Sequence, residues 1–420
     1  MRLAPVMLAL LLALSPGVVA THSAAPSASA DVRAVDSNPP ESTEPRFTLV
    51  PPTNASTTVL TLGKEPKRTA FDSPSLSLGD TLVSERSEVQ SRLSTGALEE
   101  RLRTARNDEQ KKQILNRYRY RIENRIISLS ARERQVTKAF TNGSMSADAY
   151  LRALGQIDRE AQQLRTLIDA MQTSAQPIPR FRMKTEADTL KGKLVTLEGP
   201  VRNRIAEQLR GEAPPTRVFV ATADTGVVLS AIVDGTYTRE VTRIDRRNPG
   251  LQDHISLSEV PNIVERNYPW IRNNSDSTGT ASYGATNVYR RWMTHENGRL
   301  VTYLDGGTRS IFDEIQYKRL SPSLSTGPAV TNTSENVTLS VNRTYPGGPL
   351  RVRLANETGA PLQGTISVAG ERIGRTDSAG VLWTLGPASQ FRVTATHEGT
   401  TVNATVRPTA PPRAPSGAES

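Results

Sequence analysis

The chain has 420 residues, a formal net charge of +10 and no cysteine. That length is more than one compact core requires, so it predicts two or three domains. The absence of cysteine excludes disulfides, thiolate nucleophiles and cysteine-bound metals, and a hydrophobic content of only 36% predicts long polar linkers between smaller folded units.

The N-terminus is typical of an export signal. Arg2 precedes an apolar run over residues 3–14, and Val18-Val19-Ala20 or Ala28-Ser29-Ala30 offers a cleavage site. The run is shorter than the roughly 20 residues that span a bilayer. We therefore expect a signal peptide within residues 1–30 and an extracellular or cell-surface location. An uncleaved N-terminal anchor is the alternative, and the one membrane contact that we expect.

Residues 31–79 are expected to form a disordered spacer, because Ser, Ala, Pro and acidic residues dominate the chain up to residue 46. β-branched and apolar residues at 46–50 and 57–62 flank a Pro-Pro-Thr-Asn turn, which is compatible with one short hairpin in this spacer.

Residues 80–175 carry a helical pattern. Its first apolar series recurs every seven residues, and a second follows the break at Asn142-Gly143-Ser144. Two long helices joined by so short a loop must run antiparallel. The pattern predicts an antiparallel helical coiled-coil hairpin, or a three-helix bundle if residues 82–105 add a helix interrupted at Gly96. The expected apolar positions are Leu115, Ile122, Leu129 and Val136, then Leu154, Ile157, Ala161, Leu164, Ile168 and Met171, with Val89, Leu93, Leu98 and Leu102 in the additional helix.

Residues 187–320 change to β-rich segments separated by Gly-containing turns and are expected to form an α+β domain. Its helices are expected at 201–210 and 258–271, and its strands at 218–220, 226–233, 237–244, 288–294 and 300–304.

The remainder divides into a Ser/Pro/Thr linker at 321–335, a small all-β unit at 336–407 and a disordered tail at 408–420. Six short strands at close spacing predict an Ig-like β-sandwich for the all-β unit. The expected fold class is therefore multi-domain α+β with a C-terminal β-sandwich.

Two turns of this unit carry a resemblance. A Gly-x-Pro turn at 359–361 precedes the strand at 364–368, and a Thr-Asp-x-x-Gly turn at 376–380 precedes the next strand. The pattern resembles the carboxypeptidase regulatory-like, transthyretin-like β-sandwich family. Members of that family are mostly structural appendages, so the resemblance implies a fold and little about function.

The chain as a whole resembles a group of uncharacterised exported proteins of halophilic archaea, through the segments 197–202, 226–230, 237–240 and 303–308. Its basic charge departs from the acidic composition usual in such organisms. The hairpin over 288–312 also resembles the PepSY domain, which is linked with modulation of peptidases.

No residues form a recognisable catalytic pattern. The histidines His22, His254, His295 and His397 share no helical i, i+4 spacing, and those in turns are expected to be solvated. Thr280-Ala281-Ser282-Tyr283-Gly284 departs from the nucleophile elbow and follows an expected polar loop at 273–280. We therefore expect a protein that is not an enzyme, with no catalytic residue, cofactor or metal.

Glycosylation sequons are the strongest local motif. Eight occur, against about four expected by chance from the Asn, Ser and Thr content. All the asparagines between residues 330 and 405 are sequons, which favours a glycosylated linker and sandwich over a Thr-rich composition alone. The predicted sites are Asn54, Asn142, Asn273, Asn332, Asn336, Asn342, Asn356 and Asn403.

The positive charge comes mainly from arginine, with 43 arginines and nine lysines. Arg117, Arg121 and Arg125 share one helix face. A solvated helix flank is the favoured interpretation, and attraction to an anionic surface or an acidic partner is the alternative. Nucleic acid is not expected as a partner of an exported chain.

Together these patterns predict an exported, non-catalytic cell-surface or envelope-associated protein with a structural, adhesive or partner-binding role. An envelope protein, a glycan or an anionic surface is the expected kind of partner. The alternatives are a modulator or subunit of an extracellular peptidase or envelope complex, and an exported hydrolase without a recognisable motif.

Overall fold

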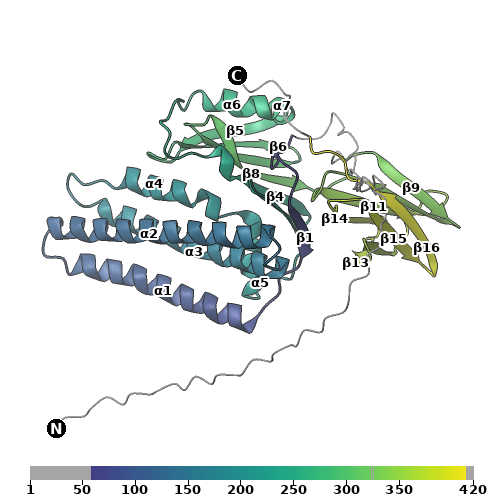
Figure 1. The fold of residues 1–420 in the computed structure, drawn as a ribbon, viewed down its shortest axis with the longest axis horizontal. Helices are drawn as coiled ribbons and strands as arrows, with labels where there is room; N and C mark the ends of the chain where they lie inside the picture. Colours follow the sequence, from purple (N-terminus) through teal and green to yellow (C-terminus); the bar gives the residue numbers. More distant parts are fainter. Residues whose placement is uncertain (1–57, 323, 325, 413–420) are drawn as a thin grey trace, which may run out of the picture. The chain divides into compact units, whose positions relative to one another are not determined.

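A computed structural model describes residues 58–322, 324 and 326–412. The described chain comprises a layer of helices, an eight-stranded antiparallel sheet and a C-terminal β-sandwich (Figure 1). The multi-domain α+β class is therefore confirmed. The predicted signal peptide, His22, Asn54 and the first half of the predicted hairpin lie outside the described residues. Within these ranges, every helix is too short or too polar to cross a membrane.

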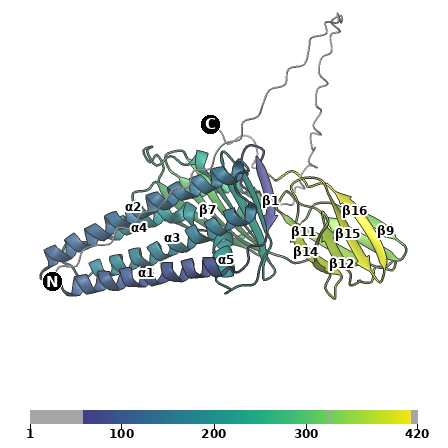
Figure 2. The same cartoon turned by 60° about the horizontal axis from the view of Figure 1, so that its bottom comes forward.

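One layer consists of helices that follow one another along the chain and lie side by side (Figure 2). Side-chain oxygens cap the start of two of them: Asn107 accepts from the backbone N–H of Gln110, and Ser146 accepts from that of Ala149. The helices are α1 (Leu78–Arg103), α2 (Asp108–Thr141), α3 (Ala147–Ala175), α4 (Lys184–Leu194) and α5 (Pro200–Leu209).

Helices α2 and α3 run antiparallel. Arg132 Nη2 donates to Gln156 Oε1 at 2.7 Å, and the hydroxyls of Thr137 and Tyr150 lie 2.9 Å apart, so positions rise on α2 as they fall on α3. The predicted seam between them is buried except at Leu164, which is half-buried. Its buried members are Leu115, Ile122, Leu129, Val136, Leu154, Ile157, Ala161, Ile168 and Met171.

The prediction for the additional helix is wrong in two respects. Helix α1 continues through Gly96, and Val89 and Leu93 lie outward, with 55% and 66% of their surface exposed. Leu98 is fully buried. The half-buried inner positions of α1 are mostly serine and threonine, so polar contacts take the place of the expected apolar seam.

The sheet is antiparallel throughout and has helices on both faces (Figure 1). Alternate residues of β2 enter different cores, as the strand pleat requires: Val218 and Val220 pack with the helical layer, and Phe219 and Ala221 pack on the face of α6 (Val260–Asn267) and α7 (Pro269–Asn273). In spatial order the strands are β1 (Arg68–Asp72), β2 (Val218–Ala223), β3 (Gly226–Val233), β4 (Thr236–Arg243), β8 (Ser310–Arg319), β7 (Gly298–Asp305), β6 (Val288–His295) and β5 (Ser275–Ser282).

The prediction of a disordered spacer over residues 31–79 is wrong where the structure describes it. Strand β1 pairs with β2 at the sheet edge. Residues 58–62 form no strand, contrary to the predicted hairpin, but they are almost wholly buried, and the Leu60 N–H donates to Glu314 Oε2 at 2.7 Å. The segment is ordered by partners about 250 residues away, which local composition does not reveal.

The other sheet edge holds a second difference. The residues expected to form a polar loop at 273–280 lie mostly in β5, which pairs with β6. The side chains of β5 are exposed or half-buried, so a polar sequence is compatible with a strand at this edge.

The C-terminal unit is a sandwich of two four-stranded antiparallel sheets around its own core. All six predicted strands are present. The strand β9 lies in the predicted linker at 321–335, and Pro408 and Thr409 in the predicted disordered tail are buried, so both predictions are wrong at these residues. The strands are β9 (Ala329–Ser334), β10 (Val337–Asn342), β11 (Pro349–Ala355), β12 (Thr365–Val368), β13 (Glu371–Arg375), β14 (Val381–Leu385), β15 (Phe391–His397) and β16 (Thr400–Val406).

Candidate functional site

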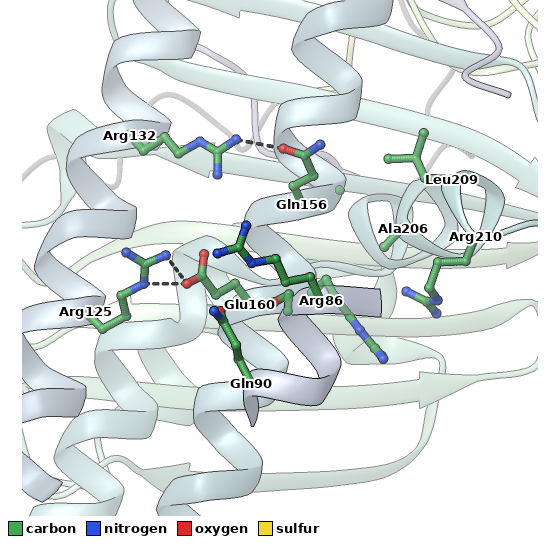
Figure 3. A pocket seen from close by; sticks show the side chains of 12 residues that line it. Arg86, Gln90, Arg125, Arg132, Gln156, Glu160, Ala206, Leu209 and Arg210 are labelled. Atoms are coloured by element: carbon green, nitrogen blue, oxygen red, sulfur yellow. Dashed lines mark hydrogen bonds and ion pairs between the residues drawn. The ribbon is translucent and has the colours of Figure 1, made fainter. Parts of the chain in front are cut away.

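An arginine-lined cleft lies among α1, α2, α3 and α5 (Figure 3). It has a volume of about 220 Å³. Gly155 on α3 and Ala206 and Leu209 on α5 give it a small apolar wall. Its remaining lining is polar: Arg86, Ser87 and Gln90 from α1, Arg125 and Arg132 from α2, Gln156, Arg159 and Glu160 from α3, and Arg210 at the end of α5.

The arginines of the cleft are not equally neutralised. Arg125 pairs with Glu160, and Arg159 Nη2 lies 2.6 Å from Glu88 Oε2. Arg132 bonds a neutral amide, and Arg86 has no ion-pair partner among the residues whose contacts the structure describes. Two guanidinium groups from two different helices thus keep their charge available to a ligand.

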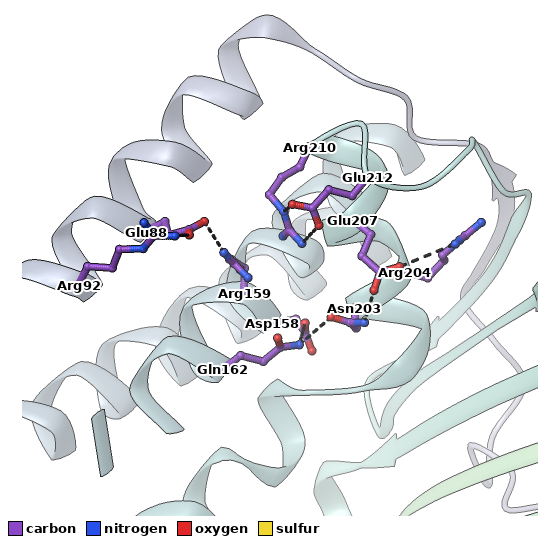
Figure 4. A network of polar contacts seen from close by, with 10 residues as sticks. All are labelled: Glu88, Arg92, Asp158, Arg159, Gln162, Asn203, Arg204, Glu207, Arg210 and Glu212. Atoms are coloured by element: carbon purple, nitrogen blue, oxygen red, sulfur yellow. Dashed lines mark hydrogen bonds and ion pairs between the residues drawn. The ribbon is translucent and has the colours of Figure 1, made fainter. Parts of the chain in front are cut away.

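Helix α1 is held at the cleft by a polar network (Figure 4). Glu88 on α1 forms ion pairs with Arg92 of its own helix and with Arg159 of α3. The distances from Nη2 of each arginine to the nearer carboxylate oxygen are 2.5 and 2.6 Å. Ser87 Oγ donates to Gln163 Oε1 on α3 at 2.8 Å. The width of the cleft therefore depends on hydrogen bonds and ion pairs rather than on an apolar interface.

The opposite wall is fixed by a buried carboxyl. Asp158 is fully buried on α3, and its Oδ1 accepts from the N–H of Gly199, the residue that precedes α5. Its Oδ2 accepts from Gln162 Nε2 at 2.6 Å, and the same amide group donates to Asn203 Oδ1 on α5. Burial raises the pKa of Asp158 well above its usual range.

Close packing places α5 directly against α3. A Cβ added at Gly155 would lie 2.9 Å from Ile205 Cγ2 and 3.1 Å from the backbone nitrogen of Ala206. Only a residue without a side chain lets the two helices approach so closely at this point of the cleft wall.

A buried arginine joins the helical layer to the sheet. Arg202 on α5, 2% exposed, donates to Glu133 on α2 at 2.6 Å and to Glu240 on β4 at 3.1 Å. Glu240 also accepts from the N–H of Val201. Burial raises the pKa of the Glu240 carboxyl, and Arg202 opposes the rise. This cluster orients α5 and hence the cleft.

The cleft is suited to binding an oxyanion. Guanidinium groups present planar, paired donors that match carboxylate, sulfate or phosphate, and they stay protonated at neutral pH. Five arginines line the cleft with one carboxylate, Glu160. Arg125 pairs with Glu160, and Arg159 and Arg210 pair with Glu88 and Glu212 beside the lining, so Arg86 and Arg132 remain without a carboxylate partner among the described residues. The described residues contain no cluster of His, Asp and Glu suited to a metal ion.

Sequence reasoning found this site only in part. Of the arginine stripe expected on α2, Arg125 lines the cleft, while Arg117 and Arg121 are exposed elsewhere on the helix. Arg132 lies seven residues after Arg125 and therefore on the same face of α2. This spacing could have added Arg132 to the predicted arginine stripe. The contributions of α1, α3 and α5 come from separate segments, so no local pattern predicts them.

The seven described sequon asparagines are exposed or half-buried. Asn142 follows α2, Asn273 ends α7, and the others lie on the sandwich. Asn356 Oδ1 accepts from the N–H of Ala360, a local turn contact. The accessibility of these side chains is compatible with modification, and glycosylation stays a prediction.

The histidines lie apart from one another. His254 is exposed and His397 half-buried. His295 is only 3% exposed, contrary to the expectation of a solvated turn residue. It ends β6, and its ring packs perpendicular to that of Trp270, with the ring centroids 5.3 Å apart. Burial, with nearby Lys318, lowers its pKa.

The described chain is modular, and the arginine-lined cleft lies within its helical layer. The chain belongs to the family of a domain of unknown function, DUF7096, whose model matches residues 1–214 and so includes the helical layer and the cleft. A family of unknown function, DUF7094, matches residues 218–323, and an archaeal fibronectin-III type-like domain matches residues 328–404.

These matches confirm an uncharacterised archaeal family and an Ig-like sandwich. The sandwich is fibronectin-III-like, where sequence reasoning named the transthyretin-like family. No curated protein matches the chain. A crystal structure of gamma-CGTase from alkalophilic Bacillus clarkii is 10% identical over 60% of this chain and 36% of that one, with a TM-score of 0.14, which is too low to support an argument.

Proposed function

We propose that this protein is an exported, non-catalytic cell-surface or envelope protein that binds an acidic partner through the arginine-lined cleft. The observation that carries the proposal is the excess of guanidinium groups over carboxylates in that cleft. Guanidinium groups do not exchange protons at neutral pH, so they favour binding over general acid–base chemistry.

The dimensions of the cleft indicate what it holds. A volume of about 220 Å³ is below the roughly 300 Å³ at which pockets for whole small molecules begin. It suits one carboxylate or sulfate group that projects from a larger envelope protein or glycan. Arg86 and Arg132 are the residues best placed to receive that group, because neither is neutralised by a carboxylate.

The proposed location rests on sequence. The apolar run over residues 3–14, the absence of cysteine and the eight sequons are typical of an exported archaeal chain, and the resemblance to proteins of halophilic archaea favours a surface protein. The antiparallel pair α2 and α3 would then serve as a coiled-coil spacer that presents the cleft.

Fluorescence anisotropy with a labelled deca-glutamate peptide tests the proposal on the full chain. The double variant Arg86→Ala/Arg132→Ala should bind at least about tenfold more weakly, because hydrogen bonds to charged groups contribute about 1.5–3 kcal/mol each. The matched control Arg117→Ala/Arg121→Ala removes the same charge from exposed positions outside the cleft. Equal weakening by both variants would show that general charge, not the cleft, attracts the peptide.

A further inference from the structure

A second cavity, of about 290 Å³, lies between the C-terminal half of α2 and the β2–β3 turn of the sheet. The proposed function makes no use of it. Buried apolar side chains of the sheet form part of its lining, with Ala223 4% and Val227 6% exposed. Ile244, next to the end of β4, also lines it and keeps 55% of its surface exposed. The free protein thus leaves a large aliphatic side chain in water beside a cavity.

The hydroxyl groups that line this cavity already have partners. Thr242 Oγ1 donates to Asp313 Oδ2 at 2.7 Å, and Thr141 Oγ1 donates to the Thr137 carbonyl at 2.7 Å. Thr137 Oγ1 lies 2.9 Å from the Tyr150 hydroxyl. Because these hydroxyl groups already have hydrogen-bond partners within the protein, a ligand does not need to supply them. An apolar ligand body can therefore enter the cavity without leaving these hydroxyl groups unpaired.

The charged residues of the lining leave a positive excess. Glu133 is paired with buried Arg202, and Asp224 is paired with Lys67 at 2.6 Å. Arg134 and Lys138 also line the cavity, one helical turn apart on α2, and neither has an ion-pair partner among the described residues. A ligand with an anionic group would meet both cations.

We propose that this cavity binds a small amphipathic anion, with its apolar aromatic or branched aliphatic body in the cavity and its acidic head group between Arg134 and Lys138. The volume is near the lower end for small-molecule pockets, which limits the body to a compact one. Burial of Ile244 supplies the hydrophobic contribution and the two cations set the orientation.

The anionic fluorophore 8-anilinonaphthalene-1-sulfonate serves as the probe, with uncharged N-phenyl-1-naphthylamine as its counterpart, on the full chain. We expect saturable binding of the anionic probe, weakened about tenfold or more by Ile244→Asp and by Lys138→Glu. The control Ile127→Asp alters an isoleucine of α2 that is exposed to a similar degree, 58%, and does not line the cavity. This variant should bind the probe as the wild type does.

Each other outcome overturns part or all of the proposal. If Ile127→Asp weakens binding as much as Ile244→Asp, or if neither variant changes it, the probe binds elsewhere and the site is refuted. Equal binding of the charged and uncharged probes would refute the anionic head group. The double variant Arg86→Ala/Arg132→Ala should keep full probe binding, which separates this cavity from the arginine-lined cleft.

Discussion

Asp313 on β8 is a buried carboxyl whose protonation should control stability. Asp313 is 4% exposed, and its Oδ2 accepts a hydrogen bond from Thr242 Oγ1 at 2.7 Å. Burial raises the pKa of Asp313 to about 8. Glu240 and Glu133 add to the rise, while Thr242 and Arg202 oppose it. Near neutral pH the folded protein therefore favours the protonated acid.

The sign of the pH dependence follows from this rise. An unfolded aspartate has a pKa of about 3.9, so the contribution of Asp313 is complete below about pH 4 and is lost as the pH rises toward 8. Four pKa units correspond to about 5 kcal/mol, an upper limit because the folded chain can relax around the charge. Asp313→Asn keeps an acceptor for Thr242 and removes the titratable group. The stability of this variant should therefore not fall through this site as the pH rises from 4 to 8.

Urea denaturation of the full chain at pH 4, 7 and 9 measures the difference. We expect the wild type and Asp313→Asn to be similar at pH 4 and the variant to be more stable by about 2–5 kcal/mol at pH 9. The control Asp245→Asn should lose stability by a similar amount at all three pH values, because Arg243 lowers the pKa of Asp245, so the stabilisation that this carboxylate gives is lost mainly below about pH 4. A difference between wild type and Asp313→Asn that is the same at every pH would refute the reasoning.

Four further outcomes are expected. Leu129→Ala should cost about 2–5 kcal/mol in the same denaturation assay, whereas Arg121→Ala should be nearly neutral; equal losses would place the arginine in an interface. Arg202→Leu should cost about 3–5 kcal/mol because it leaves the buried Glu240 and the half-buried Glu133 without their cation, and the additional change Glu240→Leu should recover part of the loss. Mass spectrometry of the native protein should find no peptide containing Met7 if the signal is cleaved after Ala20 or Ala30. Glycopeptide analysis should find a glycan at Asn403, and complete recovery of the unmodified peptide would contradict the glycosylation prediction.

The α2–α3 seam was predictable because its apolar residues recur at the helical period and bury where that period places them. Helix α1 was predictable only in part: Leu98 and Leu102 pack on the core, but Val89 and Leu93 point outward, and serine and threonine take most of its half-buried positions that the structure describes. Apolar periodicity assumes that the apolar face is the buried one, and α1 departs from that assumption.

The edge strands were also not predicted from the sequence, for a related reason. β1, β5 and β9 have one unpaired edge or a largely exposed face, so their sequences need little apolar alternation and resemble loops. Most of the arginine-lined cleft was missed because its guanidinium groups come from segments spread over more than 120 residues, Arg86 to Arg210, and only the fold brings them together.

The burial of residues 58–62 on the sheet bears on how the chain folds. The bond from Leu60 to Glu314 spans 254 residues, and β1 must wait for β2 before it can pair. During synthesis this N-terminal stretch therefore emerges long before its partners, and contacts of such long range slow folding. Until β8 is made, β4 has an unpaired edge, and the growing chain is most exposed to wrong pairing in that interval.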